Sequence, residues 1–114
     1  MFKIEAIVRE EIYEDVKYAL TKIELKGLTV YQVMGCGVQK GHIEMVRGQK
    51  IELNMLPKIK FEIVVSSQEW VDKTVEVIQK TAYTGNIGDG KIFVQQLSEV
   101  IRISTGQTGV DAIK

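Results

Sequence analysis

The sequence is short of the residues that most catalytic and metal-binding sites require. Its 114 residues include one cysteine, Cys36, and one histidine, His42. A single cysteine cannot form an intrachain disulfide, so a reducing cytoplasm is the simplest compartment. His42 has no second histidine or cysteine nearby, whereas a zinc site needs several such ligands. Cys36 has no base paired with it, so nucleophilic catalysis is not indicated, and we expect a protein that is not an enzyme.

The sequence also lacks an excess of charge of either sign, with 15 Lys and Arg residues against 15 Asp and Glu residues. Proteins that coat nucleic acids or anionic membranes need a basic excess. We therefore expect no nucleic-acid partner, although a local basic site remains open. No apolar run is long enough to span a membrane, and the first residues, MFKIEAIVREE, contain no signal-peptide core. Direct insertion into a membrane is not expected.

Apolar periodicity divides the chain into strands and helices. Residues 1–9 alternate apolar and polar side chains, as a half-buried strand does, and residues 10–26 carry apolar side chains at helical spacing, with Gly27 as the expected stop. Ser66 and Glu69 fit a capping box at the start of a second helix. The predicted elements are strand 1–9, helix 10–26, strand 28–34, strand 58–65, helix 66–83, strand 92–94, an extended segment 100–104 and a polar tail 105–114.

This order predicts one domain, residues 1–114, of the α+β class. The fold would be ferredoxin-like, βαββαβ, with an antiparallel sheet and both helices on one face. Ile7, Val64 and Phe93 are out of phase with the core positions of their strands, so they should point to the face without helices. Because apolar residues on an open sheet face indicate a partner, we infer a homo-oligomer.

Three glycines in seven residues, Gly35, Gly37 and Gly41, begin a long segment between the second and third predicted strands. The segment passes through a second turn signal, VRGQ at residues 46–49, and ends at Pro57. A loop of roughly 20 residues is unusual in a small domain, and such loops are usually functional or disordered. We interpret this one as the sensory and docking loop of a signalling protein.

A second glycine-rich turn, GNIGDGK at residues 85–91, has the composition of a phosphate site. Glycines let backbone amides converge on an anion, and Lys91 adds a positive charge. The spacing fits neither a Walker motif nor a dinucleotide fingerprint, and by itself such a stretch more often marks a plain turn. Together with the turn at residues 35–41, Lys58 and Arg102, it would form a cleft for a polyanion.

Four motifs carry a resemblance to a known family. They are TGNIGDGKIFV (84–94), GCGVQKGH (35–42), LPKIK (56–60) and VIRI (100–103). Over essentially its whole length the chain resembles the PII nitrogen-regulatory signal-transduction proteins. The first motif matches the C-terminal signature of that family, and the second matches the base of its long regulatory loop, the T-loop.

The resemblance implies a compact homotrimer with a cleft between each pair of subunits and a T-loop between the second and third strands. ATP and ADP would compete for each cleft, and 2-oxoglutarate would bind beside Mg-ATP and shift the T-loop between conformations. The residues assigned to the nucleotide are Ile7, Thr29, Gly35, Gly37, Val38, Glu62, Val64, Gly88, Asp89, Gly90, Lys91 and Arg102. Those assigned to 2-oxoglutarate are Gln39, Lys40, Gly41 and Lys58, and Gln39 would also ligate magnesium.

Through the T-loop, the resemblance implies regulation of a protein target. Candidate targets are a membrane ammonium channel, glutamine synthetase, a nitrogenase or a regulator. Arg47, at the loop tip, resembles the residue that plugs the pore of ammonium channels. A cytoplasmic protein, peripheral at the membrane when bound to such a channel, is the localisation that follows.

The chain departs from the family pattern at four informative positions. Uridylylated members have a tyrosine where this chain has Ile51, and phosphorylated members have a serine where it has Gln49. We therefore expect neither modification. Val38 and Ser104 stand where many members have phosphate-binding arginines. Because a hydrogen bond to a charged group contributes about 1.5–3 kcal/mol, we expect weaker binding of the nucleotide phosphates.

These departures keep a second interpretation open, a specialised paralogue with an altered ligand or a dedicated target such as nitrogenase. Two other classes share the predicted topology. An enzyme similar to acylphosphatase would need a catalytic Arg and Asn in particular strands, and the sequence does not supply that set. An RNA-binding module would show outward aromatic residues on its central strands and a basic face. The first strand has no outward aromatic residue, and the net charge is zero.

Overall fold

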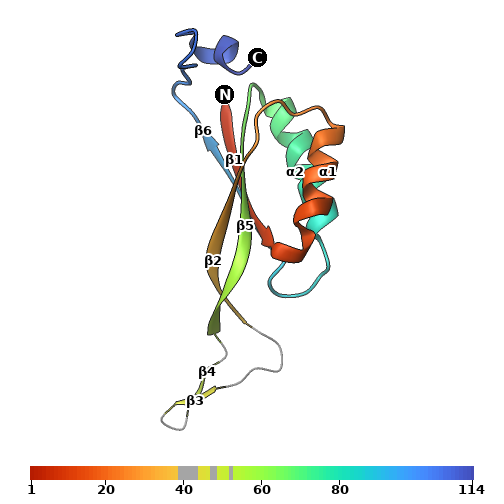
Figure 1. Ribbon diagram of the computed structural model, residues 1–114. Helices are drawn as coiled ribbons and strands as arrows, with labels where there is room; N and C mark the ends of the chain where they lie inside the picture. The colour runs from red at the N-terminus through yellow and green to blue at the C-terminus, as the bar shows by residue number, and fades with distance from the viewer. Residues whose placement is uncertain (39–43, 47–48, 52) are drawn as a thin grey trace.

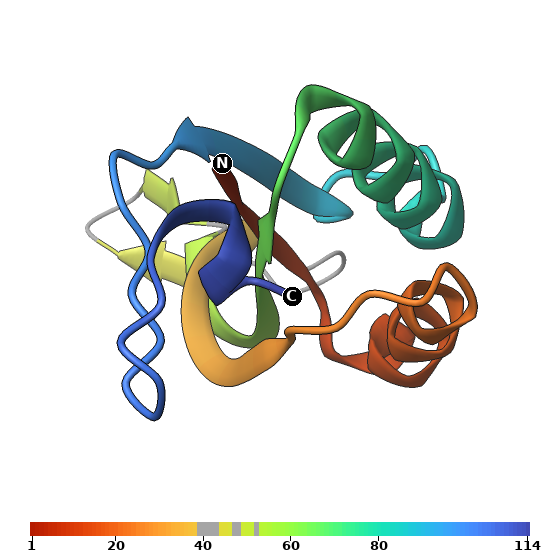
Figure 2. The same ribbon diagram turned by 90° about the horizontal axis from the view of Figure 1, so that it is seen from above.

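A twisted antiparallel sheet with two helices on one face forms the body of the chain (Figure 1), and Figure 2 shows both helices on the same side of the sheet. The structure is a computed structural model that describes residues 1–38, 44–46, 49–51 and 53–114. Its elements are β1 (Phe2–Arg9), η1 (Glu10–Ile12), α1 (Tyr13–Lys22), β2 (Thr29–Val38), β3 (Glu44–Val46), β4 (Gln49–Ile51), β5 (Leu53–Val65), α2 (Gln68–Ala82), β6 (Gly90–Gln96) and η2 (Gly109–Ala112). The main sheet has the order β2-β5-β1-β6, so the predicted ferredoxin-like α+β fold is confirmed.

The core lies between the sheet and the two helices. Ile4, Ala6 and Val8 of β1 lie opposite Ile63, Phe61 and Ile59 of β5, and all six are buried. Five helical residues complete the core: Val16, Leu20, Val71, Ile78 and Ala82. Full burial of one large apolar side chain stabilises a fold by about 1.5–3 kcal/mol. The alternation of apolar and polar residues in 1–9 and 58–65 therefore correctly predicts which face of each strand is buried.

The first helix ends earlier than its apolar pattern predicts. α1 stops at Lys22, and Glu24 takes a left-handed conformation with φ of 61°. A residue in this conformation ends a helix, and glycine usually fills that role. Here Glu24 fills it instead, and its amide donates to the carbonyl oxygen of Thr21 at 3.0 Å. The prediction that Gly27 is the stop is therefore wrong.

The second helix begins one residue later than predicted. Ser67, with an extended backbone, is the N-cap of α2, and its Oγ accepts a hydrogen bond from the amide of Trp70 at 3.3 Å. The predicted capping box of Ser66 and Glu69 is wrong by one position. Two adjacent serines both have a capping side chain, and the backbone geometry at the end of β5 decides between them.

The second and third predicted strands are both longer than their patterns indicate. β2 and β5 remain paired from Thr29↔Glu62 to Val38↔Leu53, so they extend as a two-stranded ribbon below the helices (Figure 1). Pro57 lies inside β5 and not at the end of a loop. Pro57 is tolerated because β1 ends at the Arg9↔Lys58 pair. Pro57 therefore has a strand neighbour on one side only, and proline, which has no amide hydrogen to donate, is accepted at such an edge. The segment between these two strands is therefore shorter than predicted, residues 39–52, and it includes the β3–β4 pair.

The C-terminal residues are more ordered than the predicted polar tail. An isolated bridge joins Ile101 to Thr108, and the short 3-10 helix η2 buries Ala112. The extended segment 100–104 forms one side of this small hairpin. In Figure 1 the hairpin and η2 lie at the end of the sheet opposite the β2–β5 ribbon.

Candidate functional site

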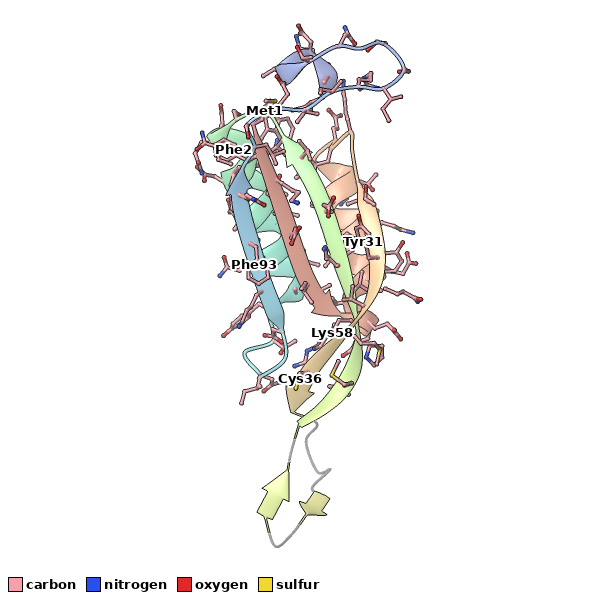
Figure 3. The ribbon with its side chains drawn as sticks, turned by 90° about the vertical axis from the view of Figure 1, so that its left-hand side faces the viewer. Met1, Phe2, Tyr31, Cys36, Lys58 and Phe93 are labelled. Atoms are coloured by element: carbon pink, nitrogen blue, oxygen red, sulfur yellow. The ribbon has the colours of Figure 1, made fainter. Side chains whose placement is uncertain are left out.

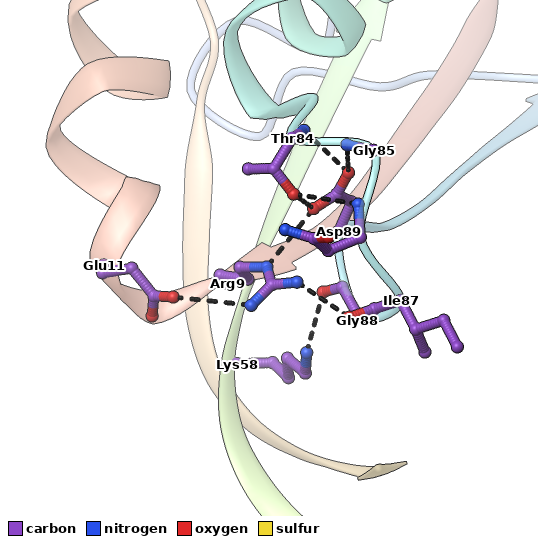
Figure 4. Close-up of polar contacts among 9 residues, drawn as sticks. Arg9, Glu11, Lys58, Thr84, Gly85, Ile87, Gly88 and Asp89 are labelled. Atoms are coloured by element: carbon purple, nitrogen blue, oxygen red, sulfur yellow. Dashed lines mark hydrogen bonds and ion pairs between the residues drawn. The ribbon is translucent and has the colours of Figure 1, made fainter. Parts of the chain in front are cut away.

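The turn between α2 and β6 is organised around the carboxylate of Asp89. Its Oδ2 accepts hydrogen bonds from the amides of Thr84 at 2.8 Å and Gly85 at 2.9 Å. Its Oδ1 accepts from the Thr84 hydroxyl, and the hydroxyl oxygen in turn accepts from the amide of Asn86 (Figure 4). The side chain thus closes the turn on itself and gives the glycine-rich segment one conformation.

These hydrogen bonds lower the pKa of the carboxyl group that accepts them. The Thr84 hydroxyl, then the Thr84 amide, hold the pKa of Asp89 at about 2, below its ordinary value of 3.8. The Gly85 amide and the Arg9 guanidinium act in the same direction. Hydrogen bonds to a carboxylate favour its charged form, so Asp89 is an anion at physiological pH.

Two cations from the sheet hold the backbone of the same turn. Arg9 Nη2 donates to the carbonyl oxygen of Ile87 at 2.8 Å, and Lys58 Nζ donates to that of Gly88 at 3.1 Å. Arg9 Nε also lies 3.3 Å from Asp89 Oδ1 (Figure 4). No carboxylate in the described part of the chain lies within ion-pair distance of Lys58.

Arg9 and Lys58 are direct cross-strand partners of β1 and β5. Like charges in such a position repel each other and destabilise the pair. Asp89 and Glu11, whose Oε1 lies 3.8 Å from Arg9 Nη1, compensate the arginine. Lys58 therefore keeps a positive charge whose partner in the described structure is a neutral carbonyl, and an anion beside it would be favoured.

Two glycines in the turn are required by the backbone and its neighbours. Gly90 has φ of 111°, and a Cβ atom there would lie 1.8 Å from the carbonyl oxygen of Ile7. Gly88 has φ of 104°, and a Cβ atom there would lie 3.2 Å from Arg9 Nη2. A side chain at either position would be strained. One at Gly90 would collide with β1, and one at Gly88 would press against the Arg9 guanidinium.

Gly35 makes room for Lys58. A Cβ atom at Gly35 would lie 3.2 Å from Cγ of Lys58, a contact that forces one side chain to move. The lysine side chain therefore passes beside β2 at a position without a side chain, and its Nζ reaches the carbonyl oxygen of Gly88. The two glycine-rich stretches of the sequence are thus linked by this one lysine, and Gly35 and Gly37, predicted in a turn, lie in the strand β2.

The residues predicted to surround the base and ribose share the helix-free face of the sheet. Thr29 lies opposite Glu62, and Ile7 lies opposite Lys60, out of phase with the core positions. Val64 lies opposite Lys3 on the same face. Figure 3 looks onto this face, with Phe93 on β6, Tyr31 on β2 and Lys58 at its lower end. The helix-free face thus carries apolar and polar residues and adjoins the 84–90 turn with its two cations, Arg9 and Lys58.

One predicted residue lies far from this site within the chain. Arg102 is in the C-terminal hairpin, where its Nη2 donates to the carbonyl oxygen of Lys114 at 2.7 Å. Figure 1 places that hairpin at the other end of the sheet, so a single chain does not bring Arg102 to the glycine turn. Lys91 starts β6 opposite Ile7, beside the turn, and its side chain is exposed.

The remaining predicted residues fall on the segment that the structure does not describe. Gln39, Lys40, Gly41 and Arg47 lie outside the described residues, as does His42. The backbone of Gly37 and Val38 is in β2, whereas the side chains of residues 37–54 are outside the description. Among the described residues, no group of three His, Cys, Asp or Glu side chains could hold a metal ion.

Two residues of the site were missed by sequence reasoning. Arg9 reads as an ordinary polar residue at the end of a strand, and only the register places it opposite Lys58. Thr84 reads as a turn residue, although its spacing of five residues from Asp89 is compatible with the closed turn seen here. In this turn, side-chain oxygens accept hydrogen bonds from backbone amides. The residue types of the turn do not by themselves show which of these bonds form.

Among the helices of the described residues, none is long and apolar enough to cross a membrane. The site formed by Arg9, Lys58 and the 84–90 turn has the residue types that suit a polyanion. A cationic pair lies beside glycines that allow close backbone approach, and an open face with apolar residues adjoins it.

Comparisons with known proteins agree with this geometry. Residues 1–107 match a family model described as "Nitrogen regulatory protein P-II". A protein of that name from Rhizobium meliloti (strain 1021) is 48% identical over 113 residues, 99% of this chain and 100% of the relative. Nitrogen regulatory protein GlnK of Escherichia coli (strain K12) is 44% identical over 110 residues, 96% of this chain and 97% of the relative.

Two solved structures are similar in both fold and sequence. A structure of B. subtilis GlnK matches with a TM-score of 0.78 and 45% identity, covering 97% of this chain and 96% of that one. A complex of B. subtilis GlnK with ATP matches with a TM-score of 0.78 and 40% identity, covering 97% of this chain and 94% of that one.

Proposed function

The chain belongs to the nitrogen regulatory protein P-II family, and from this premise we propose that it is a sensor of energy and of carbon and nitrogen status. It would bind ATP or ADP competitively and, in the presence of Mg-ATP, 2-oxoglutarate. Members of this family are regulatory proteins and not enzymes, so the output would be control of a protein target through residues 39–52.

The observation that carries the proposal is the position of Lys58. Its ammonium group donates to the Gly88 carbonyl, lies beside a second cation and has no carboxylate partner among the described residues. Phosphate and carboxylate groups are the ligands that such a site prefers, because each would accept a charge-assisted hydrogen bond.

The nucleotide would extend from this turn along the helix-free face. Ile7, Thr29, Glu62 and Val64 would surround the base and ribose, and the backbone of residues 88–90 with Lys91 would hold phosphates. The solved complex of the similar B. subtilis GlnK with ATP supports binding of a nucleotide. Gln39 would ligate Mg²⁺, and Lys58 would pair with a carboxylate of 2-oxoglutarate together with Lys40 and Gly41.

A homotrimer would complete the site. Arg102 lies at the opposite end of its own chain from the glycine turn, so it would act on the nucleotide of a neighbouring subunit. The apolar residues on the open face, among them the half-exposed Phe93, would be covered in the same assembly. One PII-type signalling domain, residues 1–114, would form each subunit.

The target would be reached through the T-loop in the cytoplasm. Arg47 supports an ammonium channel as one candidate, which would bring the protein to the membrane surface without inserting it. Ile51 and Gln49 lack the hydroxyl groups that uridylylation and phosphorylation need, so control would depend on effectors alone.

The first experiment is isothermal titration calorimetry with ATP, and then with 2-oxoglutarate in the presence and absence of Mg-ATP. We expect 2-oxoglutarate to bind only with Mg-ATP. In a Lys58→Met variant, 2-oxoglutarate binding should weaken by roughly tenfold or more, because a charge-assisted hydrogen bond contributes about 1.5–3 kcal/mol. Lys73→Met is the matched control, because Lys73 lies over the Trp70 ring on α2, away from the site.

A specific observation favours a second candidate, a specialised paralogue with another ligand or a dedicated target such as nitrogenase. Val38 and Ser104 replace arginines that many family members use for phosphates. If no adenine nucleotide binds in the calorimeter, these substitutions have removed the nucleotide function. The site assignments above would then be wrong.

A further inference from the structure

Three sulfur-containing side chains lie on one face of the β2–β5 ribbon, below the helices. Cys36 of β2 is the direct cross-strand partner of Met55 of β5. Met34 precedes Cys36 by two residues on the same strand, and side chains two apart in a strand point to the same face. Figure 3 shows Cys36 on the lower part of β2.

This face is opposite to the one that carries Lys58. Lys58 pairs with Val33, whereas Met34 pairs with Pro57 and Cys36 with Met55. Because alternate residues of a strand point to opposite faces, the sulfur side chains lie behind the ribbon as seen from the anion site. The cluster of Met34, Cys36 and Met55 therefore lies on the face opposite to Lys58, whereas Gly35, Gly37 and Val38 of the proposed nucleotide site are neighbours of Cys36 along β2.

All three side chains are accessible to solvent. Met34 is 58% exposed and Met55 is 59% exposed, and the thiol of Cys36 is free and exposed. Burial in the core of the chain therefore does not explain these residues. An isolated exposed cysteine would indicate nothing by itself, but here two thioethers lie next to it.

The spacing lets the three sulfur atoms converge. Directly opposite residues of an antiparallel pair have Cβ atoms about 4.5–5.5 Å apart, and diagonal neighbours are about 7–8 Å apart, within reach of long side chains. Met34 is the diagonal neighbour of Met55 across the ribbon. Methionine has three rotatable bonds, so both thioethers can turn toward the Cys36 sulfur without movement of the backbone.

We propose that Met34, Cys36 and Met55 form a binding site for Cu(I). Thiolate and thioether sulfurs are soft ligands that select Cu(I), whereas Zn²⁺ takes thiolate, imidazole and carboxylate ligands. One thiolate and two neutral thioethers balance the single positive charge of the ion. On binding, the thiol proton passes to solvent, a Cu–S bond forms at Cys36, and the copper keeps its oxidation state.

A bound ion would join β2 to β5 at the place where both strands extend beyond the helices. Its ligands lie on both strands, so it would crosslink β2 and β5 next to the segment 39–52. The consequence to measure is thus binding, together with stabilisation of the ribbon.

The test is an anaerobic titration of the full chain with Cu(I) in competition with the chromophoric chelator bicinchoninate. We expect one Cu(I) per chain. Cys36→Ser and Met55→Leu should each weaken binding by roughly tenfold or more, since even indirect changes around a metal cost 10–100-fold in affinity. The ATP titration of Met55→Leu should be unchanged, because Met55 is on β5 and is not among the residues assigned to the nucleotide. This result would separate the copper proposal from the nucleotide function.

A relocated thioether provides the matched control. The double variant Met55→Leu/Leu56→Met keeps the number of sulfur atoms but moves one to the opposite face of β5. It should bind Cu(I) as weakly as Met55→Leu alone. Substoichiometric copper, or equal affinity in the parent chain, Cys36→Ser and the double variant, would overturn the proposal.

Discussion

At the scale of single residues, Asp89 organises the most specific local structure in the chain. Its carboxylate accepts hydrogen bonds from two backbone amides and one hydroxyl and pairs with Arg9. The turn that presents Gly88 and Gly90 therefore depends on one negative charge. Removal of that charge should be visible in the pH dependence of stability.

We expect Asp89→Asn to destabilise the folded chain at neutral pH, and the difference from the parent to shrink in acid. The folded-state pKa of Asp89 is lowered from 3.8 to about 2. A group with a lowered pKa stabilises the fold above its unfolded pKa, and this contribution is lost as the pH falls toward the folded value. The difference should therefore be constant above about pH 5 and disappear between about pH 4 and 2.

Urea unfolding of both proteins across this range measures the effect. Asp72→Asn serves as the control, because Asp72 accepts a hydrogen bond from the exposed side chain of Gln68 on α2 and does not contact the turn. A stability difference for Asp89→Asn that stays the same from pH 7 to pH 2 would show that the charge does not hold the turn.

At the scale of elements, the start of α2 depends on one hydroxyl. Ser67 caps the helix by accepting from the Trp70 amide, whereas the neighbouring Ser66 makes no such bond. Loss of an N-cap side chain costs about 1 kcal/mol. We expect Ser67→Ala to lower the free energy of unfolding by about that amount, and Ser66→Ala to lower it by much less, as measured by chemical denaturation. Equal effects of the two substitutions would restore the capping box at Ser66.

At the scale of the whole molecule, the proposed site is divided between two ends of the chain. Lys58 and the glycine turn lie at one end of the sheet (Figure 3), and the C-terminal hairpin that contains Arg102 lies at the other (Figure 1). If Lys58 of one subunit and Arg102 of its neighbour line the same cleft, each cleft of a trimer should lie between two subunits. Analytical ultracentrifugation should then give three times the mass of the chain.

Complementation between two variants tests the shared cleft directly. Homo-oligomers of Lys58→Ala and of Arg102→Ala should each bind Mg-ATP and 2-oxoglutarate together more weakly than the parent. Mixed oligomers, prepared by co-expression, should recover strong binding in a fraction of clefts, because some clefts receive both native residues. No recovery in mixed oligomers would mean that Lys58 and Arg102 do not act in one cleft.

Elements whose apolar pattern was regular were predicted well. The alternation of Ile4, Ala6 and Val8 identified both the strand and its buried face, because burial of one face requires that period. Boundaries were predicted less well. Glu24 ends α1 in a conformation typical of glycine, and Pro57 is accepted in β5 because its neighbour β1 has already ended. The position of Pro57 depends on a strand that is distant in sequence, whereas Glu24 ends the helix by a local backbone conformation and a hydrogen bond to Thr21.

The candidate site shows the same division. Motif resemblance identified the glycine turn, Lys58 and the residues of the open face. It missed Arg9 and Thr84, because their roles depend on which strand lies opposite and how the turn closes. Arg102 was placed beside Lys58 on the assumption of neighbouring strands, and within one chain that placement is wrong.

The sequence by itself determined the order of elements, the buried faces of β1 and β5, and the family, because side-chain periodicity and motif identity are local properties of the chain. Only the tertiary structure decided that Arg9 and Lys58 are cross-strand partners over the same turn and that Arg102 is remote from it. It also decided that three sulfur side chains share the back of the ribbon. The physical reason is that register, unlike periodicity, is set by pairing between segments far apart in sequence, and a shift of one residue would move every side chain to the other face.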